Sequence, residues 1–252
     1  MPTLVLMKAF ESAPNRYDIA MRLITLGKIT KLRRELLNAI PANANVLDVG
    51  CGTGELLPLL AQRATKITAI DKDPEMVRTA RERAAAENIL DRVVINRNTA
   101  LEVDRLFPDT AFHAIVLSLL LSELTNDERA WLMRQCSRML KPDGILIIAD
   151  EFQPDSIFKR AAFYALRLPI HLITYLYTQI KALTTSNIWW KMYYTIIELP
   201  LMLLSFFTGE PLTKPVKVSE VDVPGEVKLI NVGISCDGFI RLVILQKENR
   251  TP

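Results

Sequence analysis

The sequence is poor in residues that bind metals or form disulfides. It contains three cysteines, Cys51, Cys136 and Cys236, and two histidines among 252 residues. An odd number of widely spaced cysteines does not suit a disulfide framework, and so few ligands do not suit a metal site. The sequence therefore predicts a reducing, cytoplasmic environment and no bound metal.

Blocks of like charge and long uninterrupted apolar runs are also missing. The 31 Lys and Arg residues nearly balance the 28 Asp and Glu residues, for a net charge of +3, which argues against nucleic-acid binding. No basic segment precedes the apolar residues at the N-terminus, so we expect no secretory signal. The clearest apolar run, 192–207, contains Glu198 and Pro200 and falls short of the ~20 apolar residues that a spanning helix needs.

A glycine-rich turn between an apolar strand and a helix is the strongest local signal. Residues 45–55 read N-V-L-D-V-G-C-G-T-G-E. The short apolar run predicts a strand, the glycines at 50, 52 and 54 predict a tight turn, and leucines at helical spacing follow. Because a glycine has no Cβ, a ligand can lie against the main chain of such a turn. The pattern predicts a nucleotide-like cofactor.

The acidic residues around this turn favour a cationic cofactor. Asp48 enters the turn and Glu55 opens the following helix, so two carboxylates would crowd a pyrophosphate bound there. S-adenosylmethionine instead carries a sulfonium and an ammonium, and Asp48 is placed to meet the ammonium. Asp71 ends the next predicted strand, close to the roughly 20-residue offset of a ribose-binding carboxylate.

Four motifs in order resemble the class I S-adenosylmethionine-dependent methyltransferases. They are V-L-D-V-G-C-G-T-G, A-I-D-K-D-P-E-M, F-H-A-I-V-L-S-L-L-L-S-E-L and L-K-P-D-G-I-L-I-I-A-D, and the likeness covers about residues 15 to 155. The resemblance implies an α/β fold: a Rossmann-like, doubly wound, seven-stranded sheet of order 3-2-1-4-5-7-6. The alternative is a Rossmann-like domain that binds another nucleotide or none.

The resemblance also implies where S-adenosylmethionine binds. Relatives often place an acid after the third strand, facing the adenine, where this chain has Asn98 and Thr99. Tyr17 lies in a helical pattern similar to the cap helices of the quinone-methylating branch, where a tyrosine helps to close the cofactor site. Packing on the core is the alternative for Tyr17. The remaining candidates for cofactor contact are Asp48, Gly50, Cys51, Gly52, Gly54, Asp71, Lys72 and Ser118.

The candidates for catalysis are acids near the strand ends. Because a sulfonium is already an activated methyl donor, the enzyme must mainly align the attack and exclude water, with a base where the acceptor requires one. Glu123, Asp150 and Glu151 are the candidates for that base, and Glu123 could instead be a capping or solvated acid before a helix at 126–140. His113 stands where the family usually has Asp, and we expect a partly buried, non-catalytic histidine.

The segment 158–214 departs from a minimal methyltransferase. It holds five of the six tyrosines and two of the three tryptophans, with six basic residues against two acids. Its units 168–178 and 199–208 also resemble each other. Aromatic residues beside basic ones are typical of an interfacial helix, so we expect peripheral membrane contact; a lid over the pocket and a homodimer interface are the alternatives.

These patterns predict four parts of the chain and a membrane-surface activity. The parts are an N-terminal helical cap at 1–44, a cofactor-binding core at 45–155, a hydrophobic aromatic helical insert at 156–215 and a C-terminal β-hairpin at 216–252. The preferred hypothesis is methylation of a lipophilic small molecule, a quinone precursor or a lipid, at the inner face of a membrane. Methylation of a soluble metabolite or of a corrinoid or protein partner is the alternative, and a non-catalytic cofactor-binding scaffold is a third hypothesis.

Overall fold

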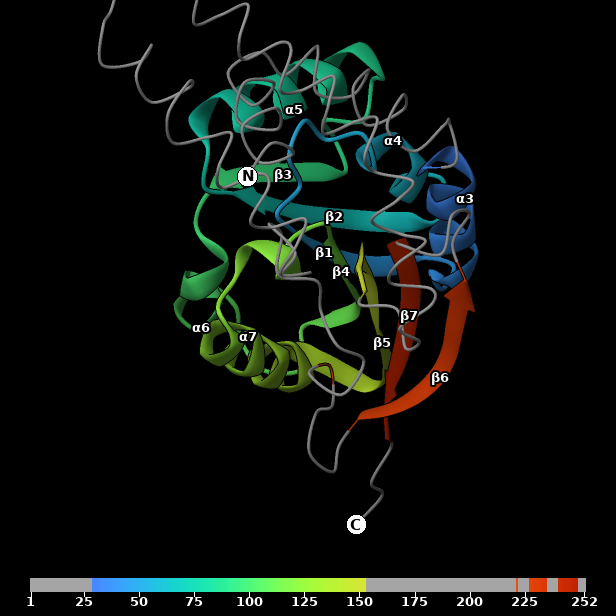
Figure 1. The fold of residues 1–252 in the computed structure, drawn as a ribbon. Helices are drawn as coiled ribbons and strands as arrows, with labels where there is room; N and C mark the ends of the chain where they lie inside the picture. Colours follow the sequence, from blue (N-terminus) through green and yellow to red (C-terminus); the bar gives the residue numbers. More distant parts are fainter. Residues whose placement is uncertain (1–28, 153–220, 222–226, 235–239, 249–252) are drawn as a thin grey trace, which may run out of the picture. The chain divides into compact units, whose positions relative to one another are not determined.

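The computed structural model describes residues 29–152, 221, 227–234 and 240–248, which belong to one compact unit (Figure 1). Most of the expected N-terminal cap, including Tyr17, and the whole of the insert at 156–215 lie outside the described residues. The same holds for the side chain of Glu151 and for the tip of the C-terminal hairpin. No helix in the described ranges is both long and apolar enough to cross a membrane.

A seven-stranded sheet of order β3-β2-β1-β4-β5-β7-β6 forms the centre of the fold, which confirms the predicted order. The first five strands are parallel, and β7 runs antiparallel to both β5 and β6. The strands are β1 (Ala44–Val49), β2 (Ala64–Asp71), β3 (Val93–Arg97), β4 (Phe112–Ser118), β5 (Leu140–Glu151), β6 (Val227–Ile234) and β7 (Ile240–Lys247). The chain changes direction across the sheet at β1, and ligands of such folds bind at the carboxyl ends of the strands there.

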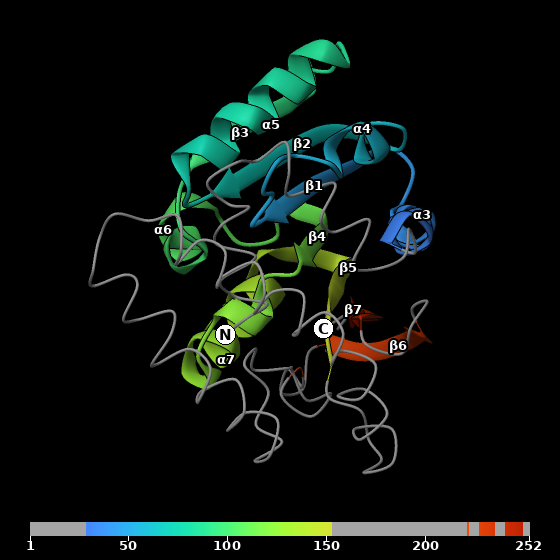
Figure 2. The same cartoon turned by 45° about the horizontal axis from the view of Figure 1, so that its top comes forward.

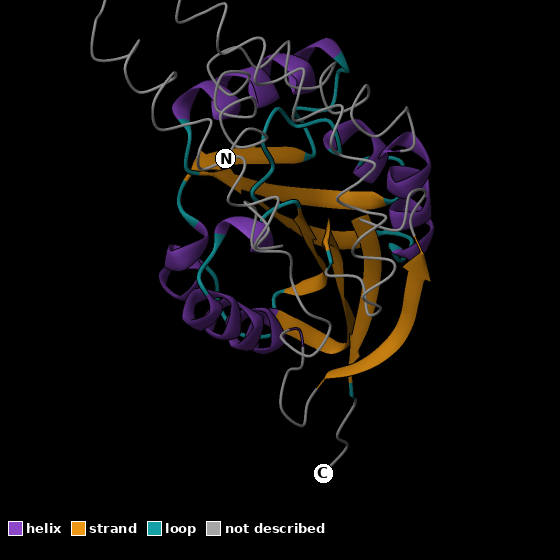
Figure 3. Cartoon of the chain, in the orientation of Figure 1, coloured by secondary structure: helices purple, strands orange, loops and turns teal. Residues whose placement is uncertain are grey.

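Helices cover both faces of this sheet, as Figures 2 and 3 show. The α-helices are α3 (Ile29–Ala39), α4 (Leu57–Leu60), α5 (Pro74–Ala86), α6 (Val103–Leu106) and α7 (Asn126–Met139), and the short 3₁₀ helices are η1 (Ala100–Glu102) and η2 (Leu121–Glu123). Val46 packs with α3, α4 and α5 in one core cluster, whereas its neighbour Leu47 packs with α6 and α7 in the other. Because parallel strands are buried on both faces, they read as continuous apolar runs.

The fifth strand corrects one sequence-based prediction. The sequence P-D-G at 142–144 predicts a turn before a strand at 145–149, whereas β5 runs without interruption from Leu140 to Glu151. The residues expected to form the turn make an irregularity instead: the register with β4 shifts after the pair of Phe112 and Leu140, and Asp143 has a φ of 60°. A positive φ within a paired strand is typical of a β-bulge, so pairing resumes beyond it.

Candidate functional site

The glycine turn lies at the carboxyl end of β1 and is bonded to β2. Gly50, Gly52 and Gly54 have φ angles of 75°, 54° and 74°, which side chains disfavour. The amides of Gly50 and Cys51 both donate to the carbonyl of Ile70, at 2.8 and 3.0 Å. A Cβ on Gly52 would meet no described atom within 4 Å, so the main chain at this residue faces open space.

Asp48 is a buried carboxylate without a hydrogen-bond partner in the part of the chain that the structure describes. Its side chain is 0% exposed, and neither of its oxygens accepts a hydrogen bond from any residue that the structure describes. Burial and, second, the negative charge of Asp71 raise the pKa of Asp48 from 3.8 to about 7. Leaving such a group unpaired is costly, so a ligand that brings a positive charge and hydrogen-bond donors would suit this site.

Asp71 lies beside this group and faces the glycine turn. Its Oδ2 accepts a hydrogen bond from the amide of Gly52 at 2.8 Å, and its Oδ1 accepts one from the amide of Asp73 at 2.9 Å. Burial raises its pKa, the two amides oppose that rise, and Glu123 adds to it. Asp71 is also close enough to Asp48 for its negative charge to raise the pKa of Asp48.

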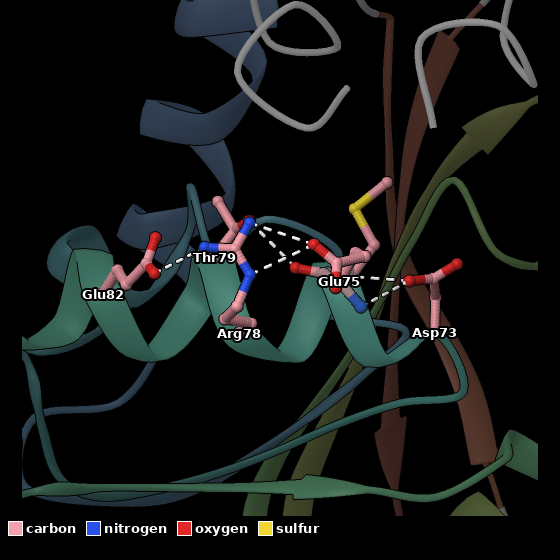
Figure 4. Close-up of polar contacts among 6 residues, drawn as sticks. Asp73, Glu75, Arg78, Thr79 and Glu82 are labelled. Atoms are coloured by element: carbon pink, nitrogen blue, oxygen red, sulfur yellow. Dashed lines mark hydrogen bonds and ion pairs between the residues drawn. The ribbon is translucent and has the colours of Figure 1, made fainter. Parts of the chain in front are cut away.

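The nearby acid Asp73 caps a helix and does not bond the glycine turn. Its Oδ1 accepts hydrogen bonds from the amides of Glu75 and Met76, at 2.7 and 3.2 Å, which caps the N-terminus of α5 (Figure 4). Arg78 bonds Glu75 and Glu82 further along the exposed face of the helix. This capping fixes where α5 begins, and it leaves Asp71 to the glycine turn.

Glu55 does not act as the sequence suggested. The sequence predicts that its charge adds to that of Asp48 and repels a pyrophosphate, but Glu55 forms an ion pair with Arg33 of α3, and both side chains are largely buried. Another arginine that the sequence did not single out, Arg83 of α5, donates to the hydroxyl of Thr53 at 3.3 Å. Among the described residues, the negative charge at the turn that no basic side chain pairs thus comes from Asp48 and Asp71.

Cys51 lies inside this turn and is buried. Burial, followed by the charges of Asp48 and Asp71, raises the pKa of its thiol well above the ordinary value. The thiol therefore stays protonated and serves the turn as a small apolar side chain.

Lys72 and Glu123, predicted for cofactor contact and catalysis respectively, form an ion pair of 3.0 Å. They follow β2 and β4, the two strands that flank β1, so the pair links the loops on either side of the glycine turn. The side chains are 68% and 47% exposed, and ion pairs in water contribute only about 0 to 1 kcal/mol. The pair can therefore open at little cost, and a catalytic role for Glu123 stays a prediction.

The remaining candidates for cofactor contact lie after β3 and at the end of β4, at the same carboxyl edge of the sheet as the glycine turn. The amide of Asn98 donates to the carbonyl of Asp71 at 3.0 Å, and its half-buried side chain makes no hydrogen bond with a described residue. The Thr99 hydroxyl accepts from the amide of Leu101 at 3.0 Å and caps η1. Asn98 is consequently better placed than Thr99 to bond a ligand, and Ser118 is half-buried at the last position of β4.

The other acid and histidine candidates lie in structural roles or outside the described side chains. Asp150 is fully buried and accepts hydrogen bonds from amides of η2. Glu151 ends β5, where its backbone pairs with Ile240. His113 is half-buried near the start of β4, at the end of the sheet opposite the glycine turn, and its Nδ1 accepts from the amide of Asn45 at 2.9 Å, which confirms the expectation of a partly buried histidine. Partial burial and then Lys141 lower its pKa.

Comparison with known proteins gives both a family and a fold. Residues 46–144 match a family model described as a methyltransferase domain. The chain is 30% identical to a demethylmenaquinone methyltransferase of Lactiplantibacillus plantarum over 57% of its own length and 60% of that relative, so it spans about three fifths of it. It is 30% identical to the ubiquinone/menaquinone biosynthesis C-methyltransferase UbiE of Geotalea daltonii, over 66% of this chain and 72% of that one.

Among solved structures, a SAM-dependent methyltransferase from Aquifex aeolicus shares the fold, with a TM-score of 0.54 and 18% identity over 94% of this chain and 98% of that chain.

Proposed function

We propose that this chain, which belongs to the class I S-adenosylmethionine-dependent methyltransferases and resembles their quinone-methylating branch, methylates a lipophilic small molecule at a membrane surface. Its cofactor is S-adenosylmethionine. The observation that carries cofactor binding is the buried, unpaired carboxylate of Asp48 beside an open glycine turn. The names of the two quinone-methylating relatives support the class of acceptor.

The residues present fit the cofactor. Asp48 would hold its ammonium, which removes the cost of an unpaired buried charge. Asp71 would hold the ribose hydroxyls, since two amides occupy only part of its capacity to accept hydrogen bonds. Gly52 would leave room for the ligand against the main chain, and Asn98 would face the adenine. S-adenosylmethionine supplies a methyl group made electrophilic by its sulfonium.

The acceptor side of the proposal rests on the composition of 158–214. Aromatic and basic residues together favour contact with a membrane surface, from which a quinone precursor or a lipid would enter the site. We place the protein at the inner face of the membrane, as a peripheral protein. A soluble metabolite, or a corrinoid or protein partner, is the second candidate, with the segment then acting as a lid or docking surface.

Cofactor binding should depend on pH through Asp48. Because the ammonium pairs with the ionised carboxylate, and the pKa of Asp48 is about 7, lowering the pH leaves a growing share of the free protein protonated there. Between about pH 7 and pH 5.5 the dissociation constant should rise roughly 15-fold, while the ammonium stays charged. Calorimetry in buffers of different ionisation enthalpy should also detect a released proton. A dissociation constant that stays level over this range would contradict the assignment.

Sedimentation with anionic liposomes tests the membrane contact. We expect the full chain to co-sediment, less so at high salt, and a chain lacking 158–214 to stay in solution. Trp189→Ala with Trp190→Ala should weaken co-sedimentation, whereas Trp131→Ala, on α7 of the core, serves as the matched control. Transfer of labelled methyl groups to a lipid and quinone extract would support the acceptor class. Label found in soluble metabolites alone, with no liposome binding, would exclude it.

A further inference from the structure

The turn after β4 is held by two buried side chains of opposite charge. Arg129 of α7 is 2% exposed and its Nε donates to the carbonyl of Leu121 at 2.6 Å. Asp150 of β5 is 0% exposed and its Oδ2 accepts from the amides of Leu121 and Ser122, at 2.7 and 3.4 Å. Both main-chain polar groups of Leu121 are thus bonded by charged side chains from different elements, and such charge-assisted bonds are strong.

This turn also contains an unfavourable backbone conformation. Leu119 has a φ of 55°, in the left-handed region that a leucine avoids at a cost of about 1 kcal/mol or more. Its amide donates to the carbonyl of Ala149 in β5 at 2.8 Å, which keeps the residue in place. Strained residues persist only where the surroundings hold them, and two desolvated charges are a costly way to do so. We therefore infer that the backbone conformation of this turn is maintained for a functional reason.

The turn contacts the cofactor-binding elements on both sides. The Leu120 side chain packs on Gly50, since its Cδ1 lies 3.1 Å from the place that a Cβ on Gly50 would take. Three residues further on, Glu123 pairs with Lys72, next to Asp71. A shift of the turn would thus release the glycine turn through Leu120, whereas the exposed pair of Glu123 and Lys72 adds little to the hold on the loop of Asp71.

We propose that Arg129 and Asp150 are positioning residues for the cofactor, which hold Leu120 against Gly50 and so fix the glycine turn that S-adenosylmethionine binds. The inference rests on the proposed function for the identity of the ligand. Neither residue touches the ligand site in this role; both act through the turn at 119–123.

Cofactor affinity of Asp150→Asn and Arg129→Gln tests this role. Calorimetry with S-adenosylmethionine and with S-adenosylhomocysteine should show dissociation constants about tenfold above the parent, in protein shown to be folded. The KM for the cofactor should rise by a similar factor, while kcat at saturating cofactor stays within about twofold. Arg129→Lys, which keeps a cationic donor, should recover part of the loss. As matched control, Met139→Ala removes a fully buried side chain from the same helix and should leave affinity within about twofold of the parent.

Leu120→Ala tests the same link without touching the buried charges, and it serves where the charge variants fail to fold. It should weaken cofactor binding about tenfold, and combining it with Asp150→Asn should weaken binding by less than the product of the two. Binding within about twofold of the parent for Leu120→Ala, or a loss no larger than that of Met139→Ala, would overturn the inference. A parent chain that binds the cofactor but methylates no lipophilic acceptor would overturn only the proposed substrate.

Discussion

Asp48→Asn is expected to remove cofactor binding and, at the same time, to stabilise the free protein. The amide keeps the shape of the side chain but loses the negative charge that we assign to the ammonium. Removing one member of a buried charge pair costs several kcal/mol, so the dissociation constant for S-adenosylmethionine should rise about 100-fold or more. Calorimetry measures this directly, and no acceptor is needed.

The gain in stability follows from the sign of the pKa shift. Asp48 has a pKa of about 7 in the folded protein against 3.8 ordinarily, so the folded state holds the proton more tightly. Stability contributed by this group is therefore complete below about pH 3.8 and falls as the pH rises towards 7, by about 4 kcal/mol in all. Asp48→Asn removes the cost of the buried charge, but its side-chain amide is also left unpaired. At pH 8 the variant should therefore recover about half of this lost stability, which corresponds to a rise of roughly 5 °C in Tm. The difference from the parent should shrink towards pH 4.

Asp73→Asn is the matched control, because it makes the same chemical change two residues beyond Asp71. Asparagine caps helices about as well as aspartate, so stability should change by less than about 0.5 kcal/mol and cofactor binding should be retained. If Asp48→Asn binds the cofactor as the parent does, the ammonium is held elsewhere. If it gains no stability at pH 8, the carboxylate has partners in the free protein.

The sequence was sufficient to predict the parts of the site that are local. Asp48 and Asp71 lie at the carboxyl ends of β1 and β2, and the glycines follow β1 directly. Parallel strands bring their carboxyl ends to one edge, so strand order alone places these residues together. The ion pair of Arg33 with Glu55 could not be predicted in this way, because it joins α3 to the turn before α4. Spacing along a chain contains no information about which surfaces of two helices meet.

The burial of Arg129 could have been predicted from the sequence. In the predicted helix at 126–140 it precedes Leu132 by three residues, Met133 by four and Cys136 by seven, so it belongs to the apolar stripe. A charge on the buried face of a helix requires a partner, and Asp150, at the end of a strand of apolar residues, has the same property. The sequence alone does not show that Arg129 and Asp150 both bond the main chain of Leu121. Tyr17 and the segment 158–214 remain predictions, as does Glu151 in catalysis.

Gly54→Ala is expected to destabilise the protein severely, because two penalties combine at that residue. Its φ is +74°, which costs an alanine about 1 to 2 kcal/mol. The new Cβ would also lie 2.9 Å from the Cβ of Ala80 and 3.0 Å from its Cα, so the backbone of α5 would have to move. Overpacking of this kind costs about 1 to 3 kcal/mol more, for a total of about 3 kcal/mol or above. Urea denaturation of the chain without cofactor should show this loss.

Gly52→Ala separates the two penalties, because a Cβ there has a φ of +54° but meets no described atom within 4 Å. It should cost only the backbone term, about 1 to 2 kcal/mol, while the methyl group enters the open space and weakens cofactor binding. Adding Ala80→Gly to Gly54→Ala removes one of the two contacts at 2.9 Å, the other being with Cδ1 of Leu57, and should recover part of the lost stability, beyond what Ala80→Gly alone costs in the helix. Equal stability of the two single variants would contradict the close approach of α5, whereas rescue by Ala80→Gly would establish that Gly54 serves helix packing and Gly52 serves the ligand.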